Sequence, residues 1–267
     1  MPIIFSLIFA VVLLGLSATD TSIQAADLKP VGGITAFAGA ERGIDNSGSA
    51  IGGVDGLGLI PLTKNLGLQG GLSLSGGQGF RLGLNAGPVL NFDSGKLGLF
   101  VDYEHFARED FNYAGIRGMG AYYFNRFDGI LSYSQPVSSV HRAGGRKLTG
   151  INELHGILRF YPTNEIELNG GVLVNSFAGA GRKDNGGTGV GGSFGVSFKL
   201  WDPIVIQLVQ AKIDNRDRYR VTSGIQVIWG SPLQEYLREQ LSLPTIGASP
   251  GGTPKSSKTP PPPSSND

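Results

Sequence analysis

Cysteine is absent from the 267-residue sequence, and histidine occurs only three times. Without cysteine, disulfide frameworks, thiolate metal sites and cysteine nucleophiles are excluded. Charged residues make up 16% of the chain, and 22 Lys and Arg nearly balance 21 Asp and Glu. The basic residues are spread along the chain rather than clustered, and the aromatic residues lie on strand-like runs. Neither a phosphate track nor a stacking platform is indicated, so nucleic-acid binding is not expected.

Glycine is abundant, with 43 residues. A glycine content this high is not expected of a helical enzyme. A chain with 40% hydrophobic residues is too apolar to be disordered. The glycine-rich stretches 115–120 and 181–195 resemble phosphate-binding loops only superficially, because no Gly-Lys-Ser/Thr sequence follows them. In strands, glycine marks bends, bulges or close packing. The composition therefore predicts a sheet protein with many tight turns.

The N-terminus has the pattern of a signal peptide. Residues 3–16 are almost entirely apolar, residues 17–24 are more polar, and Ala25-Ala26 suits a signal peptidase, although no Lys or Arg precedes the apolar run. The run is shorter than the roughly 20 residues that a helix needs to span a bilayer, which favours cleavage over a membrane anchor. We therefore expect an exported protein, cleaved near Ala25, with residues 1–25 as its signal peptide.

Between Val31 and Trp229 the chain shows alternating segments separated by turn signals, without convincing helical periodicity. Twelve segments are predicted as strands: Val31–Ala40, Ile51–Leu62, Leu66–Leu74, Phe80–Phe92, Leu97–Phe106, Phe111–Phe124, Phe127–Ser134, Thr149–Tyr161, Glu165–Phe177, Val190–Trp201, Ile204–Ile213 and Arg218–Trp229. Alternation is clearest in the third, fourth and ninth segments, where one face is apolar and the other polar. The first, second, seventh and eleventh rest partly on parity and spacing, so ten strands remain an alternative.

Short and long connections separate these strands. The tight ones are Thr63–Asn65, Asp93–Lys96, Asn125–Arg126, Pro162–Asn164 and Asp202–Pro203, and the long ones are Glu41–Ala50, Gln135–Leu148 and Ala178–Thr188. Short periplasmic turns and longer extracellular loops are typical of outer-membrane barrels. With the N-terminus on the inside, all the tight turns fall on the periplasmic side.

Aromatic residues gather at the predicted strand ends, where the headgroup and hydrocarbon regions of a membrane meet. Near the tight turns lie Phe92, Phe124, Phe127, Phe160, Tyr161, Trp201 and Trp229, and toward the other rim lie Tyr103, Phe106, Phe111, Tyr113, Tyr133, Phe177 and Tyr219. A general preference of aromatics for strands is the alternative explanation. Two aromatic girdles are the better account.

On these features, residues 31–229 resemble a small transmembrane barrel of the outer-membrane porin-like superfamily, with no subfamily assigned. The resemblance implies a closed antiparallel up-and-down all-β barrel of about 12 strands in the outer membrane, in contact with lipid. The last strand, which ends at Trp229, is similar to the signal read by the barrel-assembly machinery. In that family the terminal aromatic residue usually ends the chain, whereas here the chain continues to Asp267.

The segment after the last strand divides into two parts. Residues 231–243 predict a short amphipathic helix, because Ser231 is suited to cap it, Pro232 fits its first turn and Gln234 completes a capping box. Such a helix either enters the periplasmic mouth, packs on the rim or lies on the leaflet surface, and packing on the rim is the simplest expectation. Residues 244–267 are rich in Pro and Ser, which predicts a disordered tether, either inert or in contact with peptidoglycan or a periplasmic partner.

The polar strand faces carry charges of both signs. The candidate lumen-lining residues are Arg81, Asp102, Glu104, Arg117, Glu153, His155, Arg159, Glu167, Lys199 and Arg220, and Asp55, Asp128 and Glu165 share these faces. Charged side chains cost a few kcal/mol when they face lipid, about 2–4 for Arg or Lys at mid-depth, so an aqueous or mutually paired interior explains their placement. A selective channel for small polar solutes and a salt-bridged, closed lumen are both compatible with this pattern.

Two other functions are alternatives to the porin-like interpretation. A barrel-embedded hydrolase needs a base beside a nucleophile, and only His105, His141 and His155 are available. His155 shares a polar face with Glu153 and Arg159, but the sequence places no serine beside it. No catalytic residue, cofactor or metal site is expected. A secreted or periplasmic β-sandwich binding module is the second alternative, since its strands also alternate.

Overall fold

The computed structural model describes residues 29–42, 48–77, 79–107, 111–137, 140–141, 147–148, 151–177, 187–213, 219–229 and 233–241. Its strands are β1 (Val31–Arg42), β2 (Gly48–Pro61), β3 (Leu66–Gly76), β4 (Arg81–Phe92), β5 (Gly95–Phe106), β6 (Phe111–Phe124), β7 (Phe127–Pro136), β8 (Val140–His141), β9 (Lys147–Leu148), β10 (Ile151–Thr163), β11 (Ile166–Phe177), β12 (Gly187–Trp201), β13 (Ile204–Ile213) and β14 (Tyr219–Trp229). One helix, α2 (Leu233–Glu239), follows them. Among the described residues, no helix is long and apolar enough to cross a bilayer.

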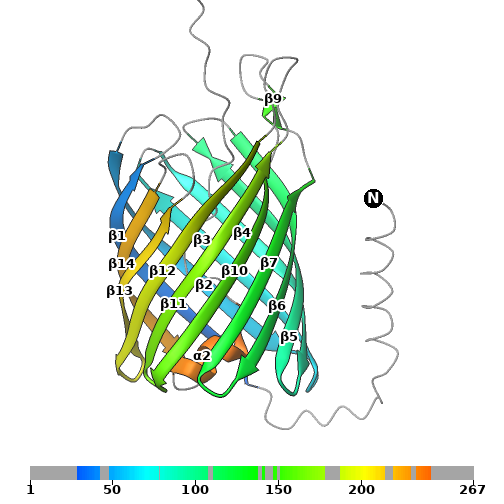
Figure 1. Cartoon of the computed structure of the whole chain (residues 1–267), viewed down its shortest axis with the longest axis vertical. Helices are drawn as coiled ribbons and strands as arrows, with labels where there is room; N and C mark the ends of the chain where they lie inside the picture. Colours follow the sequence, from blue (N-terminus) through cyan, green and yellow to red (C-terminus); the bar gives the residue numbers. More distant parts are fainter. Residues whose placement is uncertain are drawn as a thin grey trace, which may run out of the picture.

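Twelve of these strands form one closed antiparallel barrel, in which each strand pairs with its neighbours in the sequence and β7 pairs with β10 (Figure 1). The first and last strands close it, with a register that runs from Gly32 opposite Trp229 to Arg42 opposite Tyr219. Closure removes the edge strands, so that the backbone N–H and C=O groups of every strand are paired with a neighbour. This pairing is required in a bilayer, because its hydrocarbon core has no water to form hydrogen bonds with unpaired groups.

The prediction of twelve strands is confirmed, and the alternative of ten is wrong. The observed bounds differ from the predicted ones by at most a few residues. For example, β12 begins at Gly187 rather than Val190, and β10 covers Ile151–Thr163 rather than Thr149–Tyr161. Strands extend past their apolar residues because ladder pairing continues through glycine and polar positions, which alternation does not mark. The short β8–β9 pair was not predicted.

Each rim of the barrel has its own kind of connection. The turn rim is the end at which residues 62–65, 93–94, 125–126, 164–165 and 202–203 join the strands, and α2 lies at this end. Asn125 adopts a φ of 48° there, which Asn tolerates in tight turns. The loop rim is the opposite end. Much of its predicted long loops, including residues 182–185, lies outside the described residues, as do the predicted signal peptide over 1–25 and the tail over 244–267.

The outer face of the barrel is apolar. Residues such as Leu72, Val101, Leu131, Val172 and Ile225 point outward and are more than a third exposed. A β-sandwich would cover this face with a second sheet, but in the described part of the chain the twelve strands form a single closed layer with nothing packed outside it. The β-sandwich alternative is therefore wrong, and the outer face is suited to lipid.

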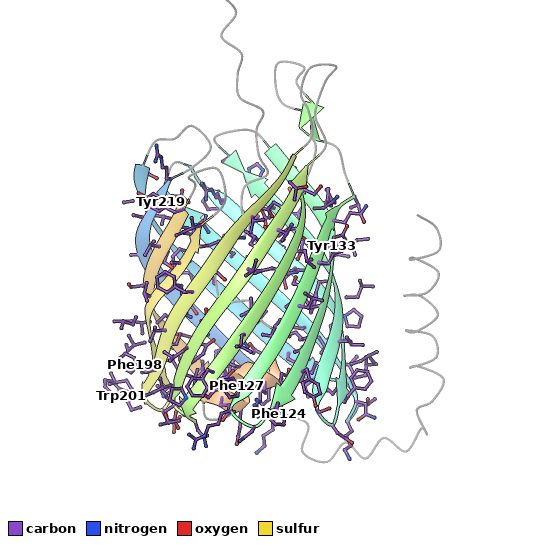
Figure 2. All side chains as sticks on the ribbon, viewed as in Figure 1. Phe124, Phe127, Tyr133, Phe198, Trp201 and Tyr219 are labelled. Atoms are coloured by element: carbon purple, nitrogen blue, oxygen red, sulfur yellow. The ribbon has the colours of Figure 1, made fainter. Side chains whose placement is uncertain are left out.

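Aromatic side chains ring both ends of the outer face. Phe124, Phe127 and Trp201 lie near the turn rim, while Tyr133 and Tyr219 lie toward the loop rim (Figure 2). Tyr161 was assigned to the first girdle, and this is wrong, because its side chain is 0% exposed and lies inside the barrel. The outward ring of Tyr122 was missed. The side chains of Phe106, Phe111, Tyr113 and Phe177 lie outside the described part.

Candidate functional site

Helix α2 lies inside the barrel at the turn rim. Its buried residues Leu233, Tyr236 and Leu237 form one apolar cluster with the inward-facing strand residues Val31, Tyr161, Val205 and Ile228. Gly33 leaves the space that the Tyr236 ring occupies. The expectation that this helix packs on the rim is therefore wrong. The inner strand ends carry apolar side chains there, so the apolar face of the helix finds more buried surface inside the mouth than outside it.

The chain continues inward from α2 to Leu241. This side chain is 2% exposed and belongs to a second apolar cluster on the inner face. The other members of the cluster are Leu59, Val89, Phe100, Met119, Ile130 and Ile157, contributed by six different strands. The turn-rim end of the interior is therefore filled by apolar packing between the barrel wall and the segment 233–241.

Polar side chains of the barrel wall donate hydrogen bonds to the carbonyl groups at the end of α2. Tyr123 Oη donates to Arg238 O at 2.9 Å, and Lys96 Nζ donates to Glu239 O. Gln69 bonds Leu241 twice, donating from Nε2 to its carbonyl oxygen at 2.7 Å and accepting from its N–H at 2.9 Å. The last carbonyls of a helix have no partner within it, and a cation is favourable near them. The wall thus provides the cap that this short helix lacks.

Arg238 connects α2 to a buried carboxylate. Its Nε donates to Asp128 Oδ1 at 2.8 Å, and Tyr161 Oη donates to Asp128 Oδ2 at 2.7 Å. The guanidinium also lies 5.5 Å from the ring centroid of Tyr123 and 5.8 Å from that of Tyr161. Asp128 is 0% exposed, so its charge depends on these partners. Arg238 was not among the predicted site residues, although a basic residue on a predicted amphipathic helix was a usable signal.

The loop-rim half of the interior contains most of the predicted lumen residues. Glu41 joins two of them, because Arg81 donates to both of its carboxylate oxygens at 2.8 Å and Arg220 donates to its Oε2 at 3.0 Å. Glu41 was missed because it fell at the edge of a predicted loop. Asp102 and Glu104 lie two residues apart on β5. Arg117 Nη2 donates to Asp102 Oδ1 at 2.7 Å.

The remaining predicted residues form separate pairs. Glu153 accepts from Lys212 Nζ at 3.2 Å, and Glu167 lies 3.2 Å from Arg159 Nε, deeper toward α2. Lys199 pairs with Asp202 at the turn rim, away from the others. Most of these charges are thus matched across strands by opposite charges on the inner face. Whether they line a conducting pore stays a prediction.

His155 contacts a serine that the sequence did not place beside it. Its Nε2 lies 3.0 Å from Ser193 Oγ, across the intervening strand β11. Gly171 makes this contact feasible, because a Cβ there would lie 2.8 Å from Ser193 Oγ and 3.0 Å from His155 Nε2. Ser193 lies within a strand that is paired on both sides, so the nearby N–H groups are engaged in ladders rather than forming an oxyanion hole. The His155–Ser193 contact is therefore not evidence for a catalytic site.

No group of three or more residues suited to hold a metal ion occurs in the described ranges. The sequence matches no protein-family model and no curated protein. Solved structures do resemble it. NanC porin superposes with a TM-score of 0.57 at 6% identity, covering 73% of this chain and 98% of that chain.

Two further structures are similar at this level. KdgM porin gives a TM-score of 0.51 at 13% identity, covering 74% of this chain and 99% of that chain. The COG4313 outer membrane channel from Pseudomonas putida F1 gives 0.51 at 11% identity, covering 79% of this chain and 100% of that chain. Identities this low establish the fold alone. The chain thus has the fold of a closed twelve-stranded antiparallel β-barrel and resembles small outer-membrane porins and channels, with no subfamily singled out.

Proposed function

We propose that this protein is a passive outer-membrane channel for small polar solutes, whose periplasmic mouth is closed by α2. The observation that carries the proposal is the contrast between the two halves of the interior. The loop-rim half is lined by ion pairs such as Arg81–Glu41 and Arg117–Asp102, whereas the turn-rim half is filled by α2 and Leu241. A charged, hydrated vestibule above an apolar closure is typical of a gated pore.

The resemblance to two porins and an outer membrane channel supports a transport role rather than an enzymatic one. The mixed charges favour small polar solutes over apolar ones, since burying an apolar solute against ion pairs offers no compensating interaction. Solute identity is not specified by these charges, because both signs occur at similar depth.

Two truncations test the closure. A stop after Gly230 removes α2 and the tail, and a stop after Leu241 removes only residues 242–267. Single-channel conductance in planar bilayers should rise for the Gly230 truncation alone. The Leu241 truncation, its matched control, should resemble the full chain. Open channels of equal, measurable conductance in all three proteins would show that α2 does not close the pore.

A closed structural barrel is the second candidate, favoured by the fully buried Asp128 and Arg159 near α2. In that case both truncations remain silent in the bilayer, while heat-modifiable migration on gels still reports a folded barrel.

We also propose that β14 is read by the barrel-assembly machinery and that residues 244–267 contact peptidoglycan or a periplasmic partner. Export through a signal peptide over residues 1–25 belongs to the same proposal.

A further inference from the structure

The segment that contains α2 enters the barrel at the turn rim and runs inward. At its start, Gln234 N donates to Asn164 O at 3.1 Å, in the tight turn between β10 and β11. At the end of the helix, the carbonyl oxygen of Glu239 accepts from Lys96, which lies two residues beyond the turn at 93–94. The contacts of the segment with the wall thus move away from the turn rim as the chain proceeds.

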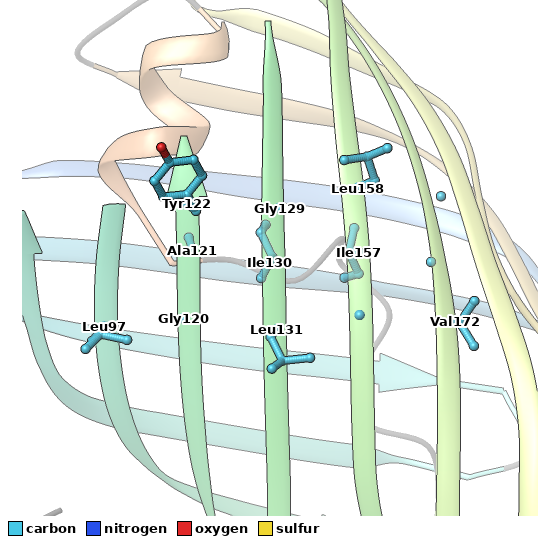
Figure 3. A pocket seen from close by; sticks show the side chains of 13 residues that line it. Leu97, Gly120, Ala121, Tyr122, Gly129, Ile130, Leu131, Ile157, Leu158 and Val172 are labelled. Carbon is cyan, nitrogen blue, oxygen red and sulfur yellow. The ribbon is translucent and has the colours of Figure 1, made fainter. Parts of the chain in front are cut away.

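Leu241 continues this direction. Its N–H and its carbonyl oxygen both bond Gln69, and a Cβ on Gly98 would lie 2.8 Å from Leu241 Cδ1. Gln69 and Gly98 each lie four residues beyond their turns. A tilted strand gains roughly 2.5 Å of height per residue, so Leu241 lies about 10 Å inside the barrel. Ile130 and Ile157, which pack with Leu241, lie side by side on β7 and β10 (Figure 3).

Close packing obstructs a return from Leu241 to the turn rim. In the range 233–241, Glu235 in the first turn of α2 is the single exposed residue, while Gln240 and Leu241 at the inner end are buried. The two apolar clusters around this segment draw side chains from nine of the twelve barrel strands. A chain that turned back would have to pass between α2 and a wall that already contacts it. The lumen above Leu241 is the direction in which the chain points.

The inner face above Leu241 carries buried polar atoms that lack a hydrogen-bond partner among the described residues. They include both carboxylate oxygens of Asp55, Asn175 Oδ1 and Gln210 Oε1, on side chains that are each more than nine-tenths buried. These residues lie seven to ten positions beyond their turns, compared with four for Gln69. All four atoms are acceptors, and buried acceptors are normally paired. They therefore favour an occupant that brings N–H donors into the lumen.

Residues 242–267 have the composition and the length of such an occupant. Seven of these 26 residues are proline and none is aromatic. Proline disfavours helix and strand, whereas the narrow polyproline II conformation leaves the N–H groups of the other residues without internal partners. About eight strand residues, or roughly 20 Å of lumen, lie above Leu241, which about seven residues at 3.1 Å each would span. The rest of the segment is then long enough to extend beyond the loop rim.

We propose that residues 242–267 pass through the lumen along its polar inner face and emerge at the loop rim, on the cell surface. The barrel wall is closed, so the lumen is the route from α2 to that side. The inference does not depend on whether the lumen conducts. It competes with the periplasmic contact of residues 244–267, which requires the chain to turn back after Leu241.

The absence of cysteine makes single-cysteine labelling of the full chain specific. Ser265→Cys is treated in intact cells with a maleimide–polyethylene glycol reagent that does not cross the outer membrane, and labelling is detected as a shift on a gel. The matched controls are Ala107→Cys at the loop rim and Ser94→Cys in a tight turn, since both positions are exposed. Ser265→Cys should be labelled in intact cells as completely as Ala107→Cys, whereas Ser94→Cys should require permeabilised cells.

Labelling of Ser265→Cys only after permeabilisation would overturn the proposal and favour a periplasmic tail. Resistance of Ser265→Cys in both states would overturn it as well, because the end of the segment would then be enclosed. Ser257→Cys repeats the test closer to the barrel, so that trimming of the last residues does not mimic a negative result. Heat-modifiable migration checks that every variant folds. The conductance of the truncations tests the channel separately, because surface labelling does not require an open pore.

Discussion

Arg238 Nε lies 2.8 Å from Asp128 Oδ1, and this ion pair ties the short helix after the last strand to the inner wall of the barrel. The carboxylate has no solvent contact, and the guanidinium is partly exposed, with 25% of its side-chain surface accessible. Asp128 therefore depends on the ion pair far more than Arg238 does.

Replacing Arg238 should loosen α2. Arg238→Ala takes a charged donor away from the buried Asp128, which keeps its hydrogen bond from Tyr161, at a cost of about 1–3 kcal/mol to the free energy of unfolding. Urea unfolding in detergent micelles measures this. Arg126→Ala is the control, because Arg126 is exposed in a turn and should change the free energy by less than about 0.5 kcal/mol. Equal effects of the two changes would rule out the ion pair as a specific anchor.

The apolar contacts of α2 are expected to matter as much as its ion pair. Tyr236→Ala removes a fully buried ring from the cluster with Val205 and Ile228, which should cost about 3–5 kcal/mol if the cavity does not collapse. The lost contacts hold α2 in the barrel mouth and are not part of the strand pairing of the barrel. Open-channel events in planar bilayers should therefore become more frequent. Glu235→Ala, on the exposed face of the same helix, should leave both readouts unchanged.

Ion selectivity should follow the charges around Glu41. Arg81→Ala removes one of its two arginine partners and makes the vestibule more negative, which favours cations. Glu41→Gln should shift selectivity in the opposite direction, since both arginines then lose their carboxylate partner. The reversal potential under a salt gradient measures these shifts, preferably in the Gly230 truncation. Unchanged potentials in both variants would contradict the assignment of these residues to a conducting lumen.

Two adjacent glycines on β11 should respond differently to a methyl group. Gly171→Ala places a Cβ 2.7 Å from Gly156 O and against the His155–Ser193 contact, so it should destabilise the barrel by about 1–3 kcal/mol. Gly170→Ala points outward into open space and should be neutral or slightly stabilising. Paired urea unfolding curves test this difference, and equal midpoints would show that the inner wall yields at this point.

The sequence alone was sufficient for the barrel itself. Alternation has a period of two residues, so Leu66–Leu74 or Phe80–Phe92 reveals which side chains share a face before any pairing is known. Turn chemistry at Asn125–Arg126 and at Asp202–Pro203 fixed the strand ends. These signals are local, because each depends on residues within a few positions of one another.

Tertiary structure decided which inward residues meet. Barrel closure brings Glu41 to Arg220, and the stagger of β10, β11 and β12 brings His155 to Ser193, although no spacing in the chain marks either pair. Tyr161 shows the limit clearly, because it lies at a strand end like a girdle residue but points to the inside. The place of α2 was also beyond the sequence. Its amphipathic pattern indicates that one face is buried, but only the closed barrel provides the apolar mouth in which that burial takes place.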